Sequence, residues 1–361
     1  GAEFNFETMR MELTSFSALL FNPVAQVKFV HTVAAGYVTG AVFVLAISSW
    51  YLLKGRDLGF ARRSFAIASA FGMASILSVI ILGDESGYEI GDVQKTKLAA
   101  IEAEWHTEPA PAAFTLFGLP NQAEQRTDYA VKIPYVMGII ATRSLDTQVT
   151  GIKDLIKQHE LRIRNGIKAY ALLEKLRSGE KTPENLAAFN QHKQDLGYGL
   201  LLKKYTPAVV DASEAQIKQA ALDTIPNVAT VFWSFRLMVA SGFLMLGLFI
   251  CAFWASARKN EEKKRWLLKW ALYSLPLPWI AAQTGWLVAE HGRQPWSIAE
   301  VLPVHLSTST ISAADVWGSL LALLAFYSVL LVIEMYLMIK FARLGPSSLH
   351  TGRYHFEQAT A

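Results

Sequence analysis

The sequence predicts an all-α membrane protein: a polytopic bundle of about five transmembrane helices with a long, mostly helical domain outside the membrane. Hydrophobic residues make up 52% of the chain and charged residues only 18%, whereas soluble domains carry about 25% charged residues. The hydrophobic residues also gather in runs of the length that crosses a bilayer, which is about 20 residues. These five runs cover residues 24–53, 65–82, 228–255, 266–289 and 314–339.

Lysine and arginine residues predict the orientation of the spans, because short cytoplasmic loops are enriched in both. Three segments that this topology places on one side of the membrane are basic: residues 54–63, 258–265 and 340–353. The short loop on the opposite side, 291–312, contains one basic residue of this kind, Arg293. We therefore expect the three basic segments to be cytoplasmic.

The same topology divides the chain into five parts. These are an outer N-terminal segment (1–23), two spans (24–82), an outer domain (83–226), three spans (227–341) and a cytoplasmic tail (342–361). A structureless loop as long as 83–226 would be unusual, and residues 152–176 show apolar positions every three or four residues. Pro276 and Pro278 should kink the fourth span, because proline removes a backbone donor.

Composition excludes several classes of protein. Cys251 is the one cysteine in the sequence, so an internal disulfide, a covalent C-x-x-C-H heme site and an iron–sulfur cluster bound by this chain alone are excluded. The formal net charge is +4, and no basic run alternates with aromatic residues. Nucleic acid is therefore not an expected partner.

Ionisable residues inside membrane spans are costly and usually functional. His31 lies in the first span, and the third span carries Arg236 and Met238. At 1.5 Å per residue, His31 and Met238 fall at similar depths, and a His/Met pair on facing helices can ligate a low-spin heme iron. Taken alone, His31 is more often a histidine bonded to a neighbouring helix, Met238 core filling, and Arg236 a residue that snorkels to the surface.

Two later spans also carry acids. Trp286, Glu290 and Arg293 have i, i+4, i+7 spacing and share one face at the outer end of the fourth span. Glu290 could serve a metal or a proton, or could pair with Arg293. Glu334 in the fifth span is expected to face the interior of the bundle.

The outer segment after the second span holds Asp84, Lys97 and Glu102. Acids and a lysine at a membrane exit suit a quinol, which needs a base for its hydroxyls and a donor for the developing quinone oxygen. The alternative is a charged amphipathic helix on the surface. Lys97 and Glu102 are five residues apart and not on one helical face, so spacing does not make them a pair.

Together these stretches resemble subunit I of the bacterial cytochrome bd-type quinol oxidases. The matching segments are residues 27–40, 83–88, 95–105, 235–238, 340–346 and the run Gly-Arg-Gln-Pro-Trp at 292–296, which is highly characteristic of that family. The resemblance implies that His31 and Met238 ligate a low-spin heme b and that Glu290 ligates a high-spin heme b. It also implies that Arg236, Trp286 and Arg293 surround the hemes. Lys97, Glu102 and Asp84 match positions tied to quinol oxidation.

The resemblance further implies a complex in the bacterial inner membrane with a second large subunit and a very small third one. Ubiquinol or menaquinol would be oxidised at the periplasmic face, and electrons would pass through the b hemes to heme d, where O2 becomes water and a proton motive force is built. The family has nine spans, and this chain resembles the last five, so the histidine ligand of heme d is expected outside it. The rival hypotheses are a non-catalytic heme-binding or scaffold fragment and, more distantly, a transporter.

Overall fold

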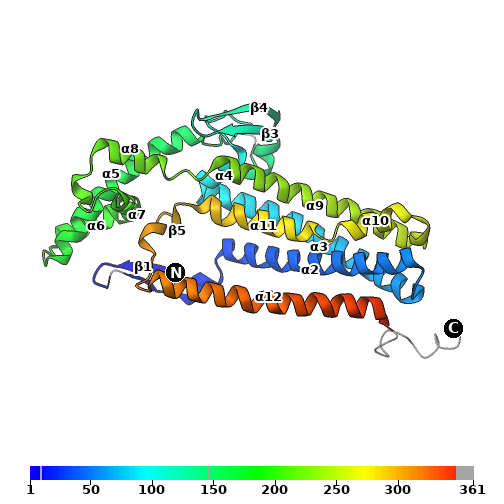
Figure 1. Cartoon of the computed structure of the whole chain (residues 1–361). Coiled ribbons are helices and arrows are strands. Elements are labelled where there is room, and N and C mark those ends of the chain that lie inside the picture. The colour runs from blue at the N-terminus through cyan, green and yellow to red at the C-terminus, as the bar shows by residue number, and fades with distance from the viewer. Residues whose placement is uncertain (9, 145, 347–361) are drawn as a thin grey trace. The chain divides into compact units, whose positions relative to one another are not determined.

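The computed structural model describes residues 1–346 apart from positions 9 and 145 (Figure 1). The chain is mostly helical, which confirms the predicted fold class. Among the described residues, four unbroken helices are long and apolar enough to cross a membrane. They are α2 (Pro23–Lys54), α3 (Leu58–Val93), α9 (Val228–Ala257) and α12 (Ala313–Leu344). The predicted tail, 342–361, lies outside the described residues from 347 onward.

The predicted fourth span is two helices in tandem. Helix α10 (Arg265–Tyr273) ends before Pro276, and α11 (Leu277–Glu290) begins directly after it. Pro276 has no N–H for a helical hydrogen bond and disfavours the α conformation in the residue before it. The span predicted over 266–289 is therefore interrupted at Pro276, where the prolines were expected to disturb the helix.

The outer region is mostly helical but contains a β-hairpin that we did not predict. Strands β3 (Phe114–Asn121) and β4 (Arg126–Ile133) pair antiparallel. Both strands are rich in aromatic and β-branched residues, which favour strands, so a sequence signal for them existed. Helix α3 also continues beyond the predicted span end at 82, which places Asp84 on a helix instead of in a loop.

The remaining elements are short except for one. The 26-residue α5 (Ile152–Arg177) is the longest helix of the outer region and covers the predicted helix 152–176. The others are α1 (Phe16–Leu20), α4 (Lys95–Glu102), α6 (Pro183–His192), α7 (Leu196–Leu200), α8 (Glu214–Leu222), and the paired strands β1 (Ala2–Asn5) with β2 (Arg10–Leu13) and β5 (Trp296–Ile298) with β6 (Leu302–Pro303). Single-turn helices at 138–142, 193–195, 201–204, 209–211, 261–263, 291–293 and 304–306 connect them.

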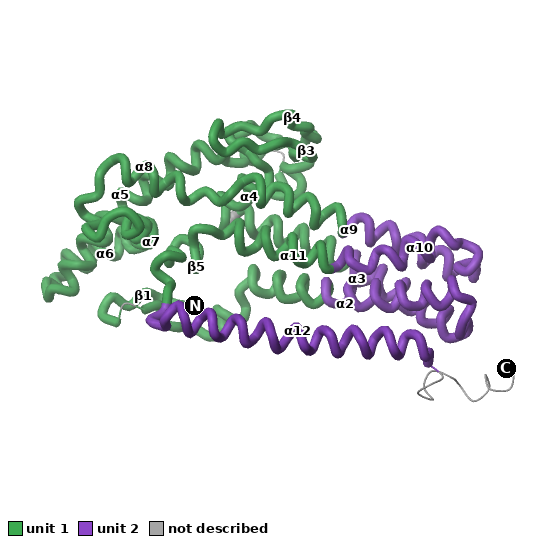
Figure 2. Tube along the Cα trace, viewed as in Figure 1, with its two compact units in different colours: residues 1–34, 78–241, 279–308 green, residues 35–77, 242–278, 309–361 purple. Residues whose placement is uncertain are grey.

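The chain forms two compact units (Figure 2). Unit 1 comprises residues 1–34, 78–241 and 279–308. Its inner cluster joins α4, α5, α9 and α11 through apolar side chains such as Ala100, Ile152, Phe232 and Val288. All the predicted site residues belong to this unit.

Unit 2 comprises residues 35–77, 242–278 and 309–361, described to 346. Helices α3 and α9 approach closely in it, since a Cβ on Gly72 would lie 2.0 Å from the Phe249 ring. Helix α12 is exposed along almost its whole length and buries none of its residues. Glu334 is exposed as well, so the expectation that it faces the interior of the bundle is wrong for the described chain.

Candidate functional site

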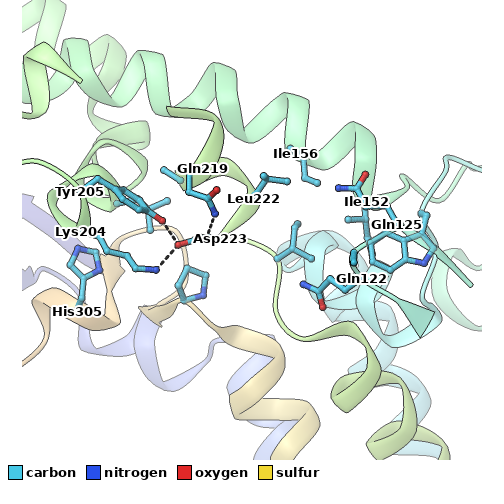
Figure 3. Close-up of a pocket in the computed structure, with 16 residues that line it drawn as sticks. Gln122, Gln125, Ile152, Ile156, Lys204, Tyr205, Gln219, Leu222, Asp223 and His305 are labelled. Atoms are coloured by element: carbon cyan, nitrogen blue, oxygen red, sulfur yellow. Dashed lines mark hydrogen bonds and ion pairs between the residues drawn. The ribbon is translucent and has the colours of Figure 1, made fainter. Parts of the chain in front are cut away.

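Unit 1 contains a cavity of about 480 Å³ (Figure 3). Its polar wall includes Lys204, whose Nζ lies 2.5 Å from Asp223 Oδ2, and Tyr205, whose hydroxyl donates to the same carboxylate. None of the predicted site residues lines this cavity. Lys97, Glu102 and Arg236 come together instead where α4 packs against α9 and the end of α11, whereas His31 and Asp84 lie elsewhere in unit 1.

Helix α4 buries six of its eight residues, including both charged residues that the sequence analysis selected. Lys97 is 2% exposed, and its Nζ donates to the carbonyl oxygen of Ala289 at 2.9 Å. Its aliphatic part lies on Gly292, where a Cβ would be 3.1 Å from Lys97 Cγ. Burial and, to a smaller extent, neighbouring cations lower the pKa of Lys97 to about 8, against the attraction of Glu290.

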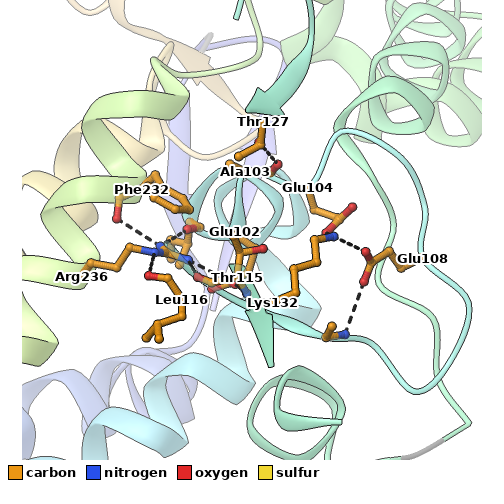
Figure 4. Close-up of polar contacts among 12 residues, drawn as sticks. Glu102, Ala103, Glu104, Glu108, Thr115, Leu116, Thr127, Lys132, Phe232 and Arg236 are labelled. Carbon is orange, nitrogen blue, oxygen red and sulfur yellow. Dashed lines mark hydrogen bonds and ion pairs between the residues drawn. The ribbon is translucent and has the colours of Figure 1, made fainter. Parts of the chain in front are cut away.

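Glu102 lies at the other end of α4 and is also 2% exposed (Figure 4). Its Oε2 accepts a hydrogen bond from the backbone N–H of Thr115 at 3.0 Å and lies 3.4 Å from Nη2 of Arg236. Burial raises the pKa of Glu102 to about 7, although the guanidinium and the N–H donor favour the charged form. A carboxyl group with this pKa can exchange a proton near neutral pH.

Arg236 binds backbone carbonyls from three elements. Its guanidinium donates to Ile101 O at 2.6 Å and to Phe232 O at 3.1 Å, and it also reaches the carbonyls of Thr115 and Leu116 in β3. The guanidinium carbon lies 3.3 Å from the ring centroid of Phe232. The side chain is only 9% exposed, so it does not snorkel to the surface.

A second acid–base cluster lies beside the first. Lys132 Nζ is 2.9 Å from Oε2 of Glu104 and also contacts Glu108 (Figure 4). Burial raises the pKa of Glu104, while its hydrogen bond with Lys132 opposes this shift. These residues are not predictable from the sequence, because Lys132 comes from β4 and only the hairpin brings it to α4.

His31 lies against α3. A Cβ on Gly83 would be 3.4 Å from Cε1 of the imidazole, and the ring has a hydrogen-bonding contact with the backbone of Val79. The Nδ1 atom is buried and has no hydrogen-bond partner among the described residues. Such an atom is unusual, because buried polar groups are nearly always satisfied.

Met238 lies against α11. Its Sδ would be 3.0 Å from a Cβ placed on Gly285. A residue larger than glycine at position 285 would therefore require the Met238 side chain to move. The next residue, Trp286, is 60% exposed. Glu290 and Arg293 form an ion pair at the C-terminal end of α11, which is the structural alternative to a metal or proton role that the sequence left open. Their side chains are 37% and 35% exposed.

Asp84 lies 3.5 Å from Nη2 of Arg143, which also contacts Glu85 at 2.5 Å. The guanidinium of Arg143 lies 4.3 Å from the ring centroid of Tyr88. The Asp84 side chain is 41% exposed. It is therefore open to solvent, whereas Lys97 and Glu102 are buried. Nothing local in the sequence pointed to Arg143.

No cluster of three or more His, Cys, Asp or Glu side chains that could hold a metal ion occurs in the part of the chain that the structure describes. This finding does not test a heme, because a porphyrin supplies four ligands to its iron and the protein adds at most two.

Residues 1–346 match the family described as cytochrome bd terminal oxidase subunit I. The chain is 48% identical over 351 residues to cytochrome bd-II ubiquinol oxidase subunit 1 of Escherichia coli (strain K12), covering 97% of this chain and 68% of that protein. It is 26% identical to cytochrome bd ubiquinol oxidase subunit 1 of Bacillus subtilis (strain 168), covering 95% and 61%. The solved bd oxidase of Geobacillus thermodenitrificans has the same fold, with a TM-score of 0.67 at 23% identity over 96% of this chain and 64% of that one.

Proposed function

The chain belongs to the cytochrome bd terminal oxidase subunit I family, and we propose that it is the heme-bearing subunit of a quinol:oxygen oxidoreductase. The relatives named above are ubiquinol oxidases. The chain spans 68% and 61% of their lengths. These shares do not say which part of each relative is covered, so the match to the last five of nine helices stays a prediction.

The observation that carries the proposal is the unpartnered Nδ1 atom of the His31 imidazole. Its buried Nδ1 has no hydrogen-bond partner in the described chain, and neutral imidazole is a good iron ligand. The thioether of Met238 and the carboxylate of Glu290 supply the other ligand types of the heme proteins that the resemblance implies. The residues present therefore fit the group, with His31 and Met238 for a low-spin heme b and Glu290 for a high-spin heme b.

When bound, the hemes would carry electrons from quinol towards oxygen. The chain's own residues would orient the ligands and move protons. Arg236 lies two residues before Met238 on α9, and Arg293 pairs with Glu290. We assign no residue of this chain to heme d, and the places of Arg236, Trp286 and Arg293 beside the hemes stay predictions.

Quinol oxidation would take place at the outer end of the bundle. Asp84 is open to solvent and can accept a proton or a hydrogen bond from a quinol hydroxyl. Glu102 has a pKa near 7, which suits proton exchange at neutral pH. Lys97 and Glu102 are each 2% exposed, so a quinol reaches them only if the surrounding segment moves.

The setting follows from the same resemblance. The chain would lie in the bacterial inner membrane with residues 83–226 on the periplasmic side and the basic loops in the cytoplasm, in accord with the distribution of Lys and Arg. It would act with a second large subunit and a very small third one, among membrane lipids. Ubiquinol or menaquinol and O2 would be its substrates, and turnover would generate a proton motive force.

The ligand assignment is tested by the substitution Met238→Leu in the purified complex. We expect loss of the low-spin heme b absorption with the other heme signals retained, because leucine fills similar space but has no sulfur. The matched control is Met245→Leu on the same helix, a buried methionine of unit 2, which should leave the spectrum intact. A normal low-spin signal in Met238→Leu would remove the assignment.

A further inference from the structure

Glu102 is a proposed proton acceptor that has no direct access to water. Its side chain is 3% exposed, and its Oε2 meets the guanidinium of Arg236 and the backbone N–H of Thr115. Neither partner can take up a proton, because an amide N–H is only a donor and a guanidinium is already fully protonated. A proton that reaches Glu102 therefore needs another group to carry it to water.

The side chain of Thr115 offers a hydroxyl at this point. Thr115 is 1% exposed, and its buried Oγ1 has no hydrogen-bond partner among the described residues. Such an atom is unusual, because buried polar groups are nearly always paired. A hydroxyl can also accept one hydrogen bond while it donates another. The residue whose N–H binds Glu102 thus carries a free group that can pass a proton on.

The β3–β4 hairpin joins Thr115 to charged residues nearer the surface. Thr115 of β3 is the register partner of Lys132 of β4, and directly opposite side chains lie on the same face of a hairpin, with Cβ atoms about 4.5–5.5 Å apart. Lys132 Nζ lies 2.9 Å from Oε2 of Glu104 and also contacts Glu108 (Figure 4). One lysine therefore holds two carboxylates beside the residue that binds Glu102.

Exposure to water increases along these groups. The side chain of Glu104 is 10% exposed, that of Glu108 25% and that of Lys132 34%, against 3% for Glu102. Burial is the main cause of the raised pKa of Glu102, and the negative charge of Glu104 adds to it. The two carboxyl groups are therefore close enough to interact, and the second lies nearer to water.

We infer that the hydroxyl of Thr115 and the cluster of Glu104, Lys132 and Glu108 form a relay that releases a quinol proton from Glu102 to water. The inference rests on the proposed function and deepens it, because it names the exit of the proton that Glu102 accepts. The relay residues act through Glu102 and touch neither quinol nor heme.

The proton transfer balances at each step. The O–H bond of the quinol breaks as the Glu102 carboxylate takes the proton, and the electrons leave by the route of the proposed function. Protonated Glu102 then gives its proton to the Thr115 oxygen while the Thr115 hydroxyl gives its own to Glu104, directly or through one water. Glu104 passes the proton to Glu108 or to solvent, so every group returns to its starting state.

The test measures quinol oxidation by the purified complex with Glu104→Gln and with Thr115→Val. We expect kcat to fall at least about tenfold in each, while the KM for quinol stays within twofold and the heme absorption is unchanged. The solvent deuterium isotope effect on kcat should rise, because proton release becomes rate-limiting. A merely structural role would not raise this isotope effect.

The two variants differ in their effect on charge. Glu104→Gln removes a negative charge that raises the pKa of Glu102, so the limb of the pH profile of kcat/KM that reports Glu102 should move to lower pH. Thr115→Val keeps this charge, the Arg236 guanidinium and the backbone N–H on Glu102, so the limb should stay in place.

A conservative variant and a surface variant complete the set. Thr115→Ser restores a hydroxyl and should recover most of the kcat that Thr115→Val loses. Glu124→Gln, on an exposed acid in the turn of the same hairpin, is the control that should leave kcat and the isotope effect unchanged.

The relay and the proposed function fail in different ways. Full kcat in Glu104→Gln and Thr115→Val, with kcat lost in Glu102→Gln, would overturn the relay and leave the proposed function standing. A lower kcat with an unchanged isotope effect or an altered heme spectrum would mean lost structure and would also overturn the relay. A parent complex that does not oxidise quinol would overturn the proposed function and the relay with it.

Discussion

Two acid–arginine contacts in the outer part of unit 1 use the same chemistry in different surroundings. Glu102 and Arg236 have side chains that are 3% and 9% exposed, whereas Asp84 and Arg143 are 41% and 43% exposed. The buried pair is embedded among backbone carbonyls and aromatic rings, and the exposed pair is shared with Glu85 at the surface. The difference indicates that the first pair fixes structure, while the second is free to exchange partners with a ligand or with water.

The largest expected effect comes from breaking the buried pair. Glu102→Ala leaves the Arg236 guanidinium without its carboxylate in a buried position, and such a loss costs about 3–5 kcal/mol. We expect a marked fall in the thermal stability of the purified complex. Thermal denaturation followed by heme absorbance measures this, with Glu124→Ala at the surface as the control. A variant as stable as the parent would show that the pair is not structural.

The pH dependence of stability sharpens the comparison. The pKa of Glu102 is raised from 4.5 to about 7 by burial, so the folded state binds a proton more tightly than the unfolded state. The protonated Glu102 therefore contributes its full share to the free energy of unfolding below pH 4.5, and this contribution is lost as the pH rises towards 7. Each unit of difference between the folded and unfolded pKa corresponds to about 1.4 kcal/mol.

Glu102→Gln cannot ionise, so we expect the parent to lose stability relative to this variant between about pH 4.5 and 7. Melting temperatures of both proteins across that range measure the difference. Parallel curves would mean that the carboxyl group does not titrate in this range.

The smallest expected effect comes from the exposed pair. Arg143→Ala removes the contacts with Asp84 and Glu85, and exposed ion pairs contribute about 0–1 kcal/mol. We expect little change in stability, and the change should shrink at high salt because solvent-exposed charges are screened. Arg126→Ala, which removes the exposed contacts with Glu124 and Asp128, should behave alike. A loss as large as that of Glu102→Ala would place Arg143 in a structural role.

The sequence predicted the residues of the candidate site better than it predicted the partners that those residues contact. His31 and Glu290 stood out because ionisable residues in membrane spans are costly, and Met238 because it falls at a depth similar to that of His31. Lys97 and Glu102 stood out because charged residues follow a span. Their partners were not predictable, since Ala289 contributes only a backbone carbonyl and Arg143 and Lys132 are far away along the chain. The same limit applies to the β3–β4 hairpin, whose pairing depends on contacts across the outer domain.

The sequence by itself determined that the chain is a helical membrane protein, because the length and polarity of an apolar run are local properties that match the thickness of a bilayer. It also determined the break before α11, because Pro276 acts on its own backbone. Only the tertiary structure decided that Lys97 and Glu102 are buried and that each meets a different helix. Burial and partner choice depend on how α4, α9 and α11 pack, which no local pattern specifies.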